Sequence, residues 1–344
     1  MKHKVSIIMP VLNGERYIST ALESIVAQTF KNHELIVVND GSTDRTAEIV
    51  DSFAGKLNIK CVCHPARKGI AVSVNDGLRT SSGDFITFLD HDDMWLPDAL
   101  ATQVSYLDQH PDVGMVYCDF QTIDPQGSVI EESVAQCRER QRPSGDVFQK
   151  LFLDSFIAAI GALIRKECFD RLGGFDETLL WGDYHMWLRI ARHYRIDYVP
   201  KVLAMYRQHD SQSTRSLPVL RREEDPVALA AIKSIVNLYP EIRQELGEKT
   251  IRQRMASIYF GGAYYWFDAG AYPNARIHLI KAMSIWPSNP RYYLMYLATL
   301  LRPSQIEAVR RVRRRLQSGC SAKKQRSGQW QGGRIASTVS DNRR

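Results

Sequence analysis

Short apolar segments alternate with amphipathic helical patterns along the first 120 residues, and this alternation leaves few folds open to the chain. An apolar run of five to eight residues between turn signals predicts a buried strand. Strands that alternate with helices at this spacing predict an α/β fold with a doubly wound, mostly parallel sheet, whose ligands bind beyond the carboxyl ends of the strands. The expected strands are residues 5–9, 33–38, 59–63, 85–90 and 113–120.

Acidic residues stand at the ends of two expected strands, where a ligand would bind. Asp40 follows the second strand, and Asp90, Asp92 and Asp93 end the fourth. Asp90 and Asp92 would offer oxygens to one hard divalent cation and leave coordination positions for phosphate oxygens. Asp-rich turns also cap helices, so the triplet alone leaves both interpretations open. Acids brought to one sheet edge by separate strands favour a ligand site.

The turn after the first expected strand argues against two other classes of α/β enzyme. It reads PVLNG over residues 10–14. A dinucleotide-binding enzyme that transfers hydride would need Gly-x-Gly-x-x-Gly here. A nucleotidyltransferase would need a glycine-rich loop that carries Arg or Lys. The sequence therefore favours neither class.

The net charge of +7 comes from the C-terminal end of the chain. Residues 302–344 hold twelve Lys and Arg against two acids, a net charge of +10, which leaves −3 for residues 1–301. The high pI is therefore no argument that the body binds nucleic acid. Arginines surround one apolar helical face in this tail, a pattern that suits an anionic membrane surface, although RNA or solvent would also fit. The apolar positions are Ile306, Val309, Val312 and Leu316.

Cysteine usage and hydropathy point to the cytoplasm. The six cysteines show no metal-binding spacing, and Cys61 and Cys63 alternate in an expected strand, where we expect both to be buried. We find no signal-peptide core and no run of about 18 apolar residues that could span a membrane. The expected location is cytoplasmic, at the inner face of the plasma membrane if the basic tail binds lipid.

Three ordered segments resemble glycosyltransferase family 2, a family of inverting enzymes with the A-type nucleotide-sugar fold. They read VSIIMPVLNGERYISTALESIVAQTF, ELIVVNDGSTDRT and GDFITFLDHDD. The resemblance implies that Asp40 holds the nucleotide base and that the chain around Lys68 borders the nucleotide. It also implies that Asp90 and Asp92 meet the ribose and, through Mg²⁺ or Mn²⁺, the diphosphate. The residues implied to line the base pocket with Asp40 are Pro10, Val11 and Asn13.

Two further positions match the family downstream. Asp183 matches the catalytic base, although an isolated Asp at a helix start could simply cap the helix. The acid that usually precedes it is Gly182 here, and a frequent downstream Asp is His185, which we expect to point outward or to pack rather than to relay protons. His209 matches a histidine that closes over the diphosphate as a metal ligand or hydrogen-bond donor. A surface-loop histidine is the alternative.

The C-terminal third reads as helical, with one hairpin that resembles a tetratricopeptide repeat. One repeat cannot bury itself, so we expect it to pack on the catalytic domain or on a partner. Its many aromatic residues would cover the main domain or meet a lipid–water interface. The expected domains are a catalytic domain over residues 1–217, a helical region over 218–301, and a basic amphipathic helix with a disordered tail over 302–344.

These observations predict a metal-dependent inverting glycosyltransferase. It would move one sugar from a nucleotide-diphosphate sugar, expected to be a UDP-sugar, to a hydroxyl of a glycan or lipid-linked acceptor in cell-surface polysaccharide or glycolipid synthesis. The Gln-x-x-Arg-Trp motif and membrane spans of processive synthases do not follow. The alternative is a degenerate member that acts as a scaffold, but Asp40, Asp90, Asp92 and Asp183 are all present and favour an enzyme.

Overall fold

The computed structural model describes residues 4–137, 142–179, 182–212, 227–301 and 305. The basic tail expected over residues 302–344 therefore lies outside the described residues, apart from Gln305. The chain forms two compact units, Met1–Tyr259 and Phe260–Arg344, and each is considered by itself. Among the described residues, no helix has both the length and the apolar character that a membrane crossing requires.

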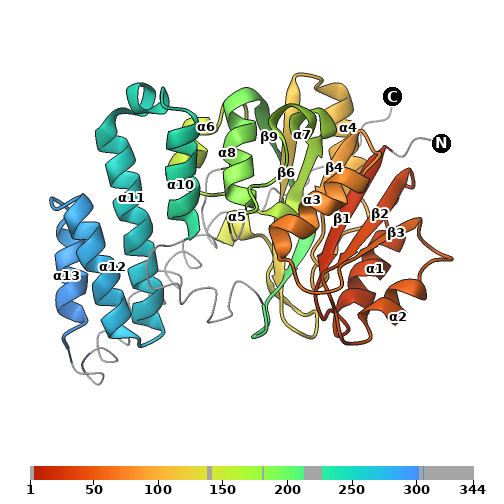
Figure 1. Ribbon diagram of the computed structural model, residues 1–344, viewed down its shortest axis with the longest axis horizontal. Coiled ribbons are helices and arrows are strands. Elements are labelled where there is room, and N and C mark those ends of the chain that lie inside the picture. The colour runs from red at the N-terminus through yellow and green to blue at the C-terminus, as the bar shows by residue number, and fades with distance from the viewer. Residues whose placement is uncertain (1–3, 138–141, 180–181, 213–226, 302–304, 306–344) are drawn as a thin grey trace, which may run out of the picture. The chain divides into compact units, whose positions relative to one another are not determined.

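The first unit is built on a mixed sheet with strand order β3-β2-β1-β4-β8-β6-β9-β5, and β7 pairs with β6 (Figure 1). Strands β3, β2, β1 and β4 are parallel, β8 runs antiparallel between β4 and β6, and β6 is parallel to β9. The expected α/β fold is thus confirmed, with a parallel first half and a mixed second half. The strands are β1 (Val5–Val11), β2 (His33–Asn39), β3 (Ile59–Cys63), β4 (Phe85–Phe88), β5 (Met94–Trp95), β6 (Val113–Ile123), β7 (Val129–Glu131), β8 (Ala162–Arg165) and β9 (Arg195–Arg207).

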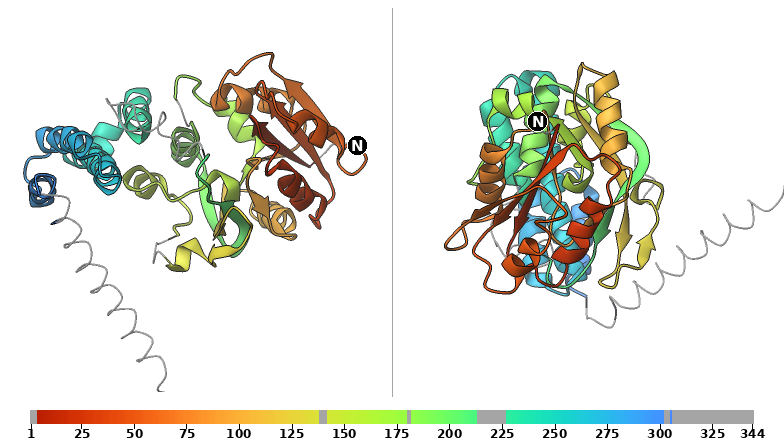
Figure 2. Two further views of the ribbon diagram at one scale, coloured as in Figure 1. Left: turned by 90° about the horizontal axis from the view of Figure 1, so that it is seen from below. Right: turned by 90° about the vertical axis from the view of Figure 1, so that its right-hand side faces the viewer.

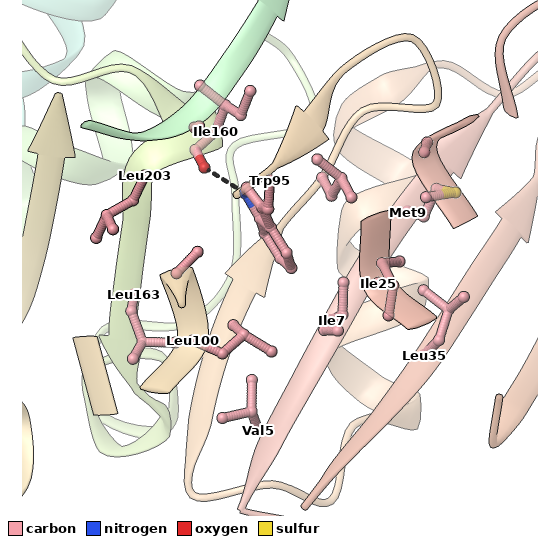
Figure 3. Close-up of a cluster of buried hydrophobic side chains, with 14 of the residues drawn as sticks. Val5, Ile7, Met9, Ile25, Leu35, Trp95, Leu100, Ile160, Leu163 and Leu203 are labelled. Carbon is pink, nitrogen blue, oxygen red and sulfur yellow. Dashed lines mark hydrogen bonds between the residues drawn. The ribbon is translucent and has the colours of Figure 1, made fainter. Parts of the chain in front are cut away.

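Helices cover both faces of the parallel half (Figure 2), which explains why β1 is apolar without alternation. Ile7 belongs to a buried cluster with residues of α1 and α4 (Figure 3). Ile8 faces α3, where a Cβ on Gly77 would lie 2.5 Å from its Cγ2. Trp95 Nε1–H donates to Ile160 O at 2.9 Å within the cluster (Figure 3). The helices are α1 (Ile18–Val26), α2 (Thr46–Asp51), α3 (Ile70–Thr80), α4 (Ala99–Gln109), α5 (Val134–Cys137), α6 (Phe148–Leu153), α7 (Lys166–Leu172) and α8 (Asp183–His193).

The C-terminal third is helical, as expected. Helix α10 (Val227–Leu238) packs against α8 in the first unit, and Arg192 of α8 pairs with Glu241 and Glu245. Helix α11 (Ile242–Asp268) is broken at Gly247, whose φ is 76°. In the second unit, α12 (Tyr272–Ile285) and α13 (Pro290–Ala298) pack side by side (Figure 1).

One expectation about local structure is wrong, because Cys61 and Cys63 are exposed rather than buried. They lie on β3, the outermost strand of the parallel half, and the face of the strand on which they alternate is exposed. In the apolar segment 157–164 strand β8 begins only at Ala162, because Ala159–Gly161 forms a 3₁₀ turn.

Candidate active site

The carboxyl ends of β2, β1 and β4 lie next to one another at one edge of the sheet. Val11 pairs with Asn39, and Ile8 pairs with Phe88. Asp40 comes directly after β2, and Asp90 follows β4 by two residues. The structure therefore brings Asp40 and Asp90 to the same sheet edge, on either side of the end of β1.

The carboxylate of Asp40 is buried, and both of its oxygens accept hydrogen bonds. Oδ1 accepts from the Lys68 N–H at 2.7 Å, and Oδ2 accepts from the Gly69 N–H at 2.9 Å. His64 Nδ1 lies 2.7 Å from Oδ1, and His64 Nε2 lies 2.8 Å from Asp76 Oδ2. Burial raises the pKa of Asp40, but the bonds from His64, Lys68 and Gly69 outweigh it and hold the pKa below its usual value. Asp40 thus stays ionised and fixes the loop after β3.

The loops after β1 and β2 are tied together beside Asp40. The Asn13 N–H donates to Ser42 Oγ at 3.0 Å, and Asn13 Oδ1 accepts from the Thr43 N–H at 2.8 Å. Gly41 has a φ of 81°, and a Cβ there would lie 2.9 Å from backbone atoms of Ala66 and Arg67. The residues expected to line the nucleotide pocket thus lie on three connected segments. Pro10 and Val11 are buried at the end of β1, Asn13 is exposed after it, and the Lys68 side chain is exposed.

A cluster of three carboxylates follows β4. Oxygens of Asp90, Asp92 and Asp93 lie within 4.8 Å of one another. Desolvation by the surrounding protein, with the charges of Asp92 and Asp183, raises the pKa of Asp90 to about 7, although the residue is exposed at the surface. Closely spaced carboxylate oxygens are the donor set that Mg²⁺ or Mn²⁺ prefers, so these residues fit a divalent cation. Asp93 was not predicted as a site residue, although it is the third acid of the triplet.

Arg207 holds this cluster from β9. Its backbone N–H donates to Asp93 Oδ1 at 2.8 Å, and its Nε–H donates to Asp92 O at 2.9 Å. The guanidinium also lies 4.8 Å from the centre of the Tyr17 ring. Only 3% of Arg207 is exposed. Arg207 and Tyr17 could not be recognised as site residues from the sequence, because their contacts join distant segments.

His209 lies against Asp92 and is buried, which excludes the surface-loop alternative. Its Nε2 lies 2.9 Å from Asp92 Oδ2, and its Nδ1 lies 2.8 Å from Ser211 Oγ. The ring packs on Tyr17 with 4.7 Å between centroids. His209 is thus held beside the acid cluster by contacts on both nitrogens.

Asp183 is the first residue of α8, as expected. Burial raises its pKa, and its charge in turn helps to raise the pKa of Asp90, so the two carboxylates lie within electrostatic range of each other. An aromatic contact fixes this arrangement, because Phe88 at the end of β4 packs against Trp187 of α8 at 6.2 Å between centroids. His185 is buried, and its Nε2 lies 3.2 Å from Ser234 Oγ of α10, so it is a packing residue.

Comparison with known proteins decides the family. The model of glycosyl transferase family 2 matches residues 6–173. An uncharacterized glycosyltransferase of Rickettsia prowazekii is 34% identical over 225 residues, which are 64% of this chain and 69% of that protein. The UDP-Glc:alpha-D-GlcNAc-diphosphoundecaprenol beta-1,3-glucosyltransferase WfgD of Escherichia coli is 30% identical over 225 residues, 64% of this chain and 84% of that protein. The chain belongs to glycosyltransferase family 2.

Solved structures support the same fold for this family 2 chain. S. aureus TarS 1–349 in complex with UDP-GlcNAc superposes with a TM-score of 0.59 at 20% identity, over 86% of this chain and 84% of that one. Mannosyltransferase PcManGT of Pyrobaculum calidifontis, in complex with GDP-Man and Mn²⁺, superposes with a TM-score of 0.58 at 22% identity. The superposition covers 90% of this chain and 85% of that one. The expected A-type glycosyltransferase fold is thereby confirmed.

The matches to family 2 cover only part of this chain and only part of some relatives. Asp40, Asp90 and Asp92 fall within the matched residues 6–173, whereas Asp183 and His209 lie beyond them. The chain spans 66% of a relative in Rickettsia typhi and 35% of one in Rickettsia felis.

Proposed function

We propose that the chain transfers one sugar from a nucleotide-diphosphate sugar to an acceptor hydroxyl and inverts the anomeric centre. The observation that carries this proposal is the proximity of Asp183 to Asp90, because the two acids are 93 positions apart in sequence, yet the charge of Asp183 helps to raise the pKa of Asp90. A sugar bound between them would have Asp90 and the acid cluster on the side of its diphosphate and the Asp183 carboxylate on the opposite side.

The nucleotide would bind at the joined loops after β1, β2 and β3. Asp40 would serve here by holding the Lys68–Gly69 backbone in place. Its Oδ1 is taken by the Lys68 N–H and His64, whereas its Oδ2, which accepts from the Gly69 N–H, keeps capacity for a further hydrogen bond from the base. Pro10, Val11 and Asn13 would line the base, and Lys68 would border it. We propose a UDP-sugar as donor, which the similarity to TarS in complex with UDP-GlcNAc and to the E. coli UDP-Glc-dependent glucosyltransferase supports.

Asp90, Asp92 and His209 would hold Mg²⁺ or Mn²⁺. A bound cation would act as a Lewis acid and neutralise charge that develops on the diphosphate. Arg207 would keep Asp92 and Asp93 oriented toward that cation through its bonds to their backbone and side-chain oxygens. His209 would keep the Asp92 carboxylate in one position, since its ring is clamped between Tyr17 and Ser211.

Asp183 would act as general base. Its raised pKa makes the carboxylate a better proton acceptor than an ordinary Asp, and a positioned base contributes a factor of roughly 10² to 10⁴. It would take the proton of the acceptor hydroxyl as that oxygen attacks the anomeric carbon from the side opposite the nucleotide. An α-linked donor would then give a β-linked product.

Two substitutions test these assignments. Asp183→Asn should lower transfer by about 10²-fold or more with nucleotide-sugar affinity nearly unchanged, because only the base is lost. Asp92→Ala should weaken Mn²⁺-dependent nucleotide binding. Asp51→Asn, at an exposed position of α2, is the matched control. Wild-type turnover by Asp183→Asn would show that the base assignment is wrong, and a wild type that binds nucleotide sugar but transfers none would favour a scaffold.

The E. coli relative indicates a class of acceptor. We propose a lipid-linked sugar in cell-envelope polysaccharide synthesis, because the name of the E. coli relative specifies a diphosphoundecaprenol-linked GlcNAc acceptor. The reaction would take place on the cytoplasmic side of the membrane, with the basic tail near anionic lipid. Transfer to an undecaprenyl-diphosphate sugar, compared with a soluble glycan of the same sugar, would test this choice.

A further inference from the structure

Helix α13 is apolar on two opposite sides. Tyr292 and Met295 face inward and are buried. The residues on the other side recur at helical spacing, and the turn continues past Ala298, where the Leu300 N–H donates to Leu297 O at 3.0 Å. We call this side the α13 outer face. It consists of Tyr293, Leu294, Leu297, Leu300 and Leu301, which are 45%, 66%, 59%, 57% and 41% exposed.

The unit that carries this face is strongly cationic. Phe260–Arg344 contains fifteen Lys and Arg against three acids, a net charge of +12. Met1–Tyr259 therefore carries −5 of the total of +7. Within the described part of the second unit, Asp268 is the one acid, against Arg276, Lys281 and Arg291. Exposed apolar side chains and positive charge thus occur together in one unit.

We propose that the α13 outer face docks on a lipid bilayer that carries anionic headgroups. Large apolar side chains on one helical face enter the boundary between headgroups and acyl chains, while nearby cations attract the anionic surface. Nucleic acid would satisfy the charge but would leave five large apolar side chains in water. A second copy would bring two units of like charge together, which repulsion opposes.

The proposal concerns residues that the proposed transfer reaction does not use. The acids of the candidate active site all lie in the first unit, whereas the α13 outer face lies in the second. Vesicle binding can therefore be measured without any donor or acceptor. A failure of sugar transfer would leave the docking proposal intact, and the reverse also holds.

Co-sedimentation of the full chain with vesicles tests the proposal. Vesicles of phosphatidylglycerol mixed with phosphatidylcholine are compared with vesicles of phosphatidylcholine alone. We expect the wild type to bind the anionic vesicles more tightly, and the double variant Leu294→Ser with Leu297→Ser to lose about tenfold or more of that binding. Val129→Ser with Ile130→Ser, on the exposed β7, is the matched control and should bind as the wild type does.

Several outcomes would overturn the proposal. One is wild-type affinity of the Leu294 and Leu297 double variant for anionic vesicles. Another is no binding of the wild type to anionic vesicles. A third is a wild-type dimer, seen by light scattering without vesicles, that becomes a monomer in the double variant, because the face would then be an interface between copies.

Discussion

Gly41 couples the buried Asp40 to the shape of the loop after β3. Its φ of 81° is unfavourable for residues with a Cβ, and a Cβ would meet the Ala66–Arg67 backbone at 2.9 Å. Gly41→Ala should therefore displace the Lys68 and Gly69 N–H groups from Asp40. We expect the free energy of unfolding to fall by about 1–3 kcal/mol and nucleotide-sugar affinity to fall by about tenfold.

Urea denaturation and a binding titration would measure the two effects of Gly41→Ala. Gly55→Ala is the control, because a Cβ there has no atom within 4 Å in the structure. Equal donor affinity for Gly41→Ala and the wild type would mean that this loop does not shape the nucleotide pocket.

Arg207 is the second residue whose substitution should affect the site from outside it. Arg207→Lys keeps the charge but loses the planar set of donors that reaches Asp92 O, Asp124 O and Pro125 O. We expect a folded protein in which Mn²⁺ raises the melting temperature less than in the wild type, because the acid cluster is less well held. Arg45→Lys, at an exposed pair with Glu48, should respond to Mn²⁺ as the wild type does.

At the scale of elements, Glu34 of β2 links β1, β3 and the turn before β4 at the sheet edge opposite the acids. It accepts from Ser6 Oγ of β1 at 2.7 Å and from the Ser82 N–H before β4 at 2.8 Å, and it pairs with Lys60 of β3 at 2.7 Å. Burial raises the pKa of Glu34, but these bonds outweigh it and lower the pKa to about 2. A carboxyl group whose pKa is lower in the folded than in the unfolded protein stabilises the fold at pH values above the unfolded-state pKa. This stabilisation is lost as the pH falls toward the folded-state pKa.

Glu34 should therefore contribute roughly 3 kcal/mol of stability at neutral pH that disappears between about pH 5 and pH 2. Urea unfolding of the wild type and of Glu34→Gln across this range would measure it. The variant should be less stable at pH 7, and the difference should shrink in acid. Glu23→Gln, on the exposed side of α1, should not show this dependence.

Whether a strand could be predicted from the sequence depended on what covers its two faces and on which strands it pairs with. Strands β1, β2 and β4 could be predicted because helices cover both faces and make their sequences continuously apolar. Strand β8 could not be delimited, since its four residues are defined by pairing with β4 and β6, which are distant in sequence. Cys61 and Cys63 were misassigned because alternation does not reveal whether a helix covers the face.

The residues of the candidate site also fall into those that could be predicted from the sequence and those that could not. Asp90 and Asp92 stand out in a short sequence segment, so their closeness was predictable, and the family resemblance supplied Asp183 and His209. The engagement of Asp40 by His64 was not predictable, because it depends on where the loop after β3 ends. Tyr17 and Arg207 are ordinary residues whose importance arises from long-range packing.

At the scale of the whole molecule, ligand binding should stabilise the fold through the first unit. A ligand that binds only the folded state at about 100 times its dissociation constant adds roughly 2.7 kcal/mol. We expect Mn²⁺ with the matching UDP-sugar to raise the melting temperature, and EDTA to abolish most of the increase. Asp92→Ala should remove the Mn²⁺ dependence, and an equal increase in EDTA would argue against a metal-dependent donor site.

Strand β8 runs opposite to both of its neighbours and separates the sheet into two halves. Asp40, Asp90 and Asp92 belong to the chain before it, whereas Asp183 and His209 come after it. A hybrid chain that joins two family members between residues 154 and 158 would keep the first three acids from one parent and the last two from the other. Under the proposed roles, recombination at this point would replace the general base together with Arg207 and His209 beside the acid cluster, and would keep the loops around Asp40 from one parent.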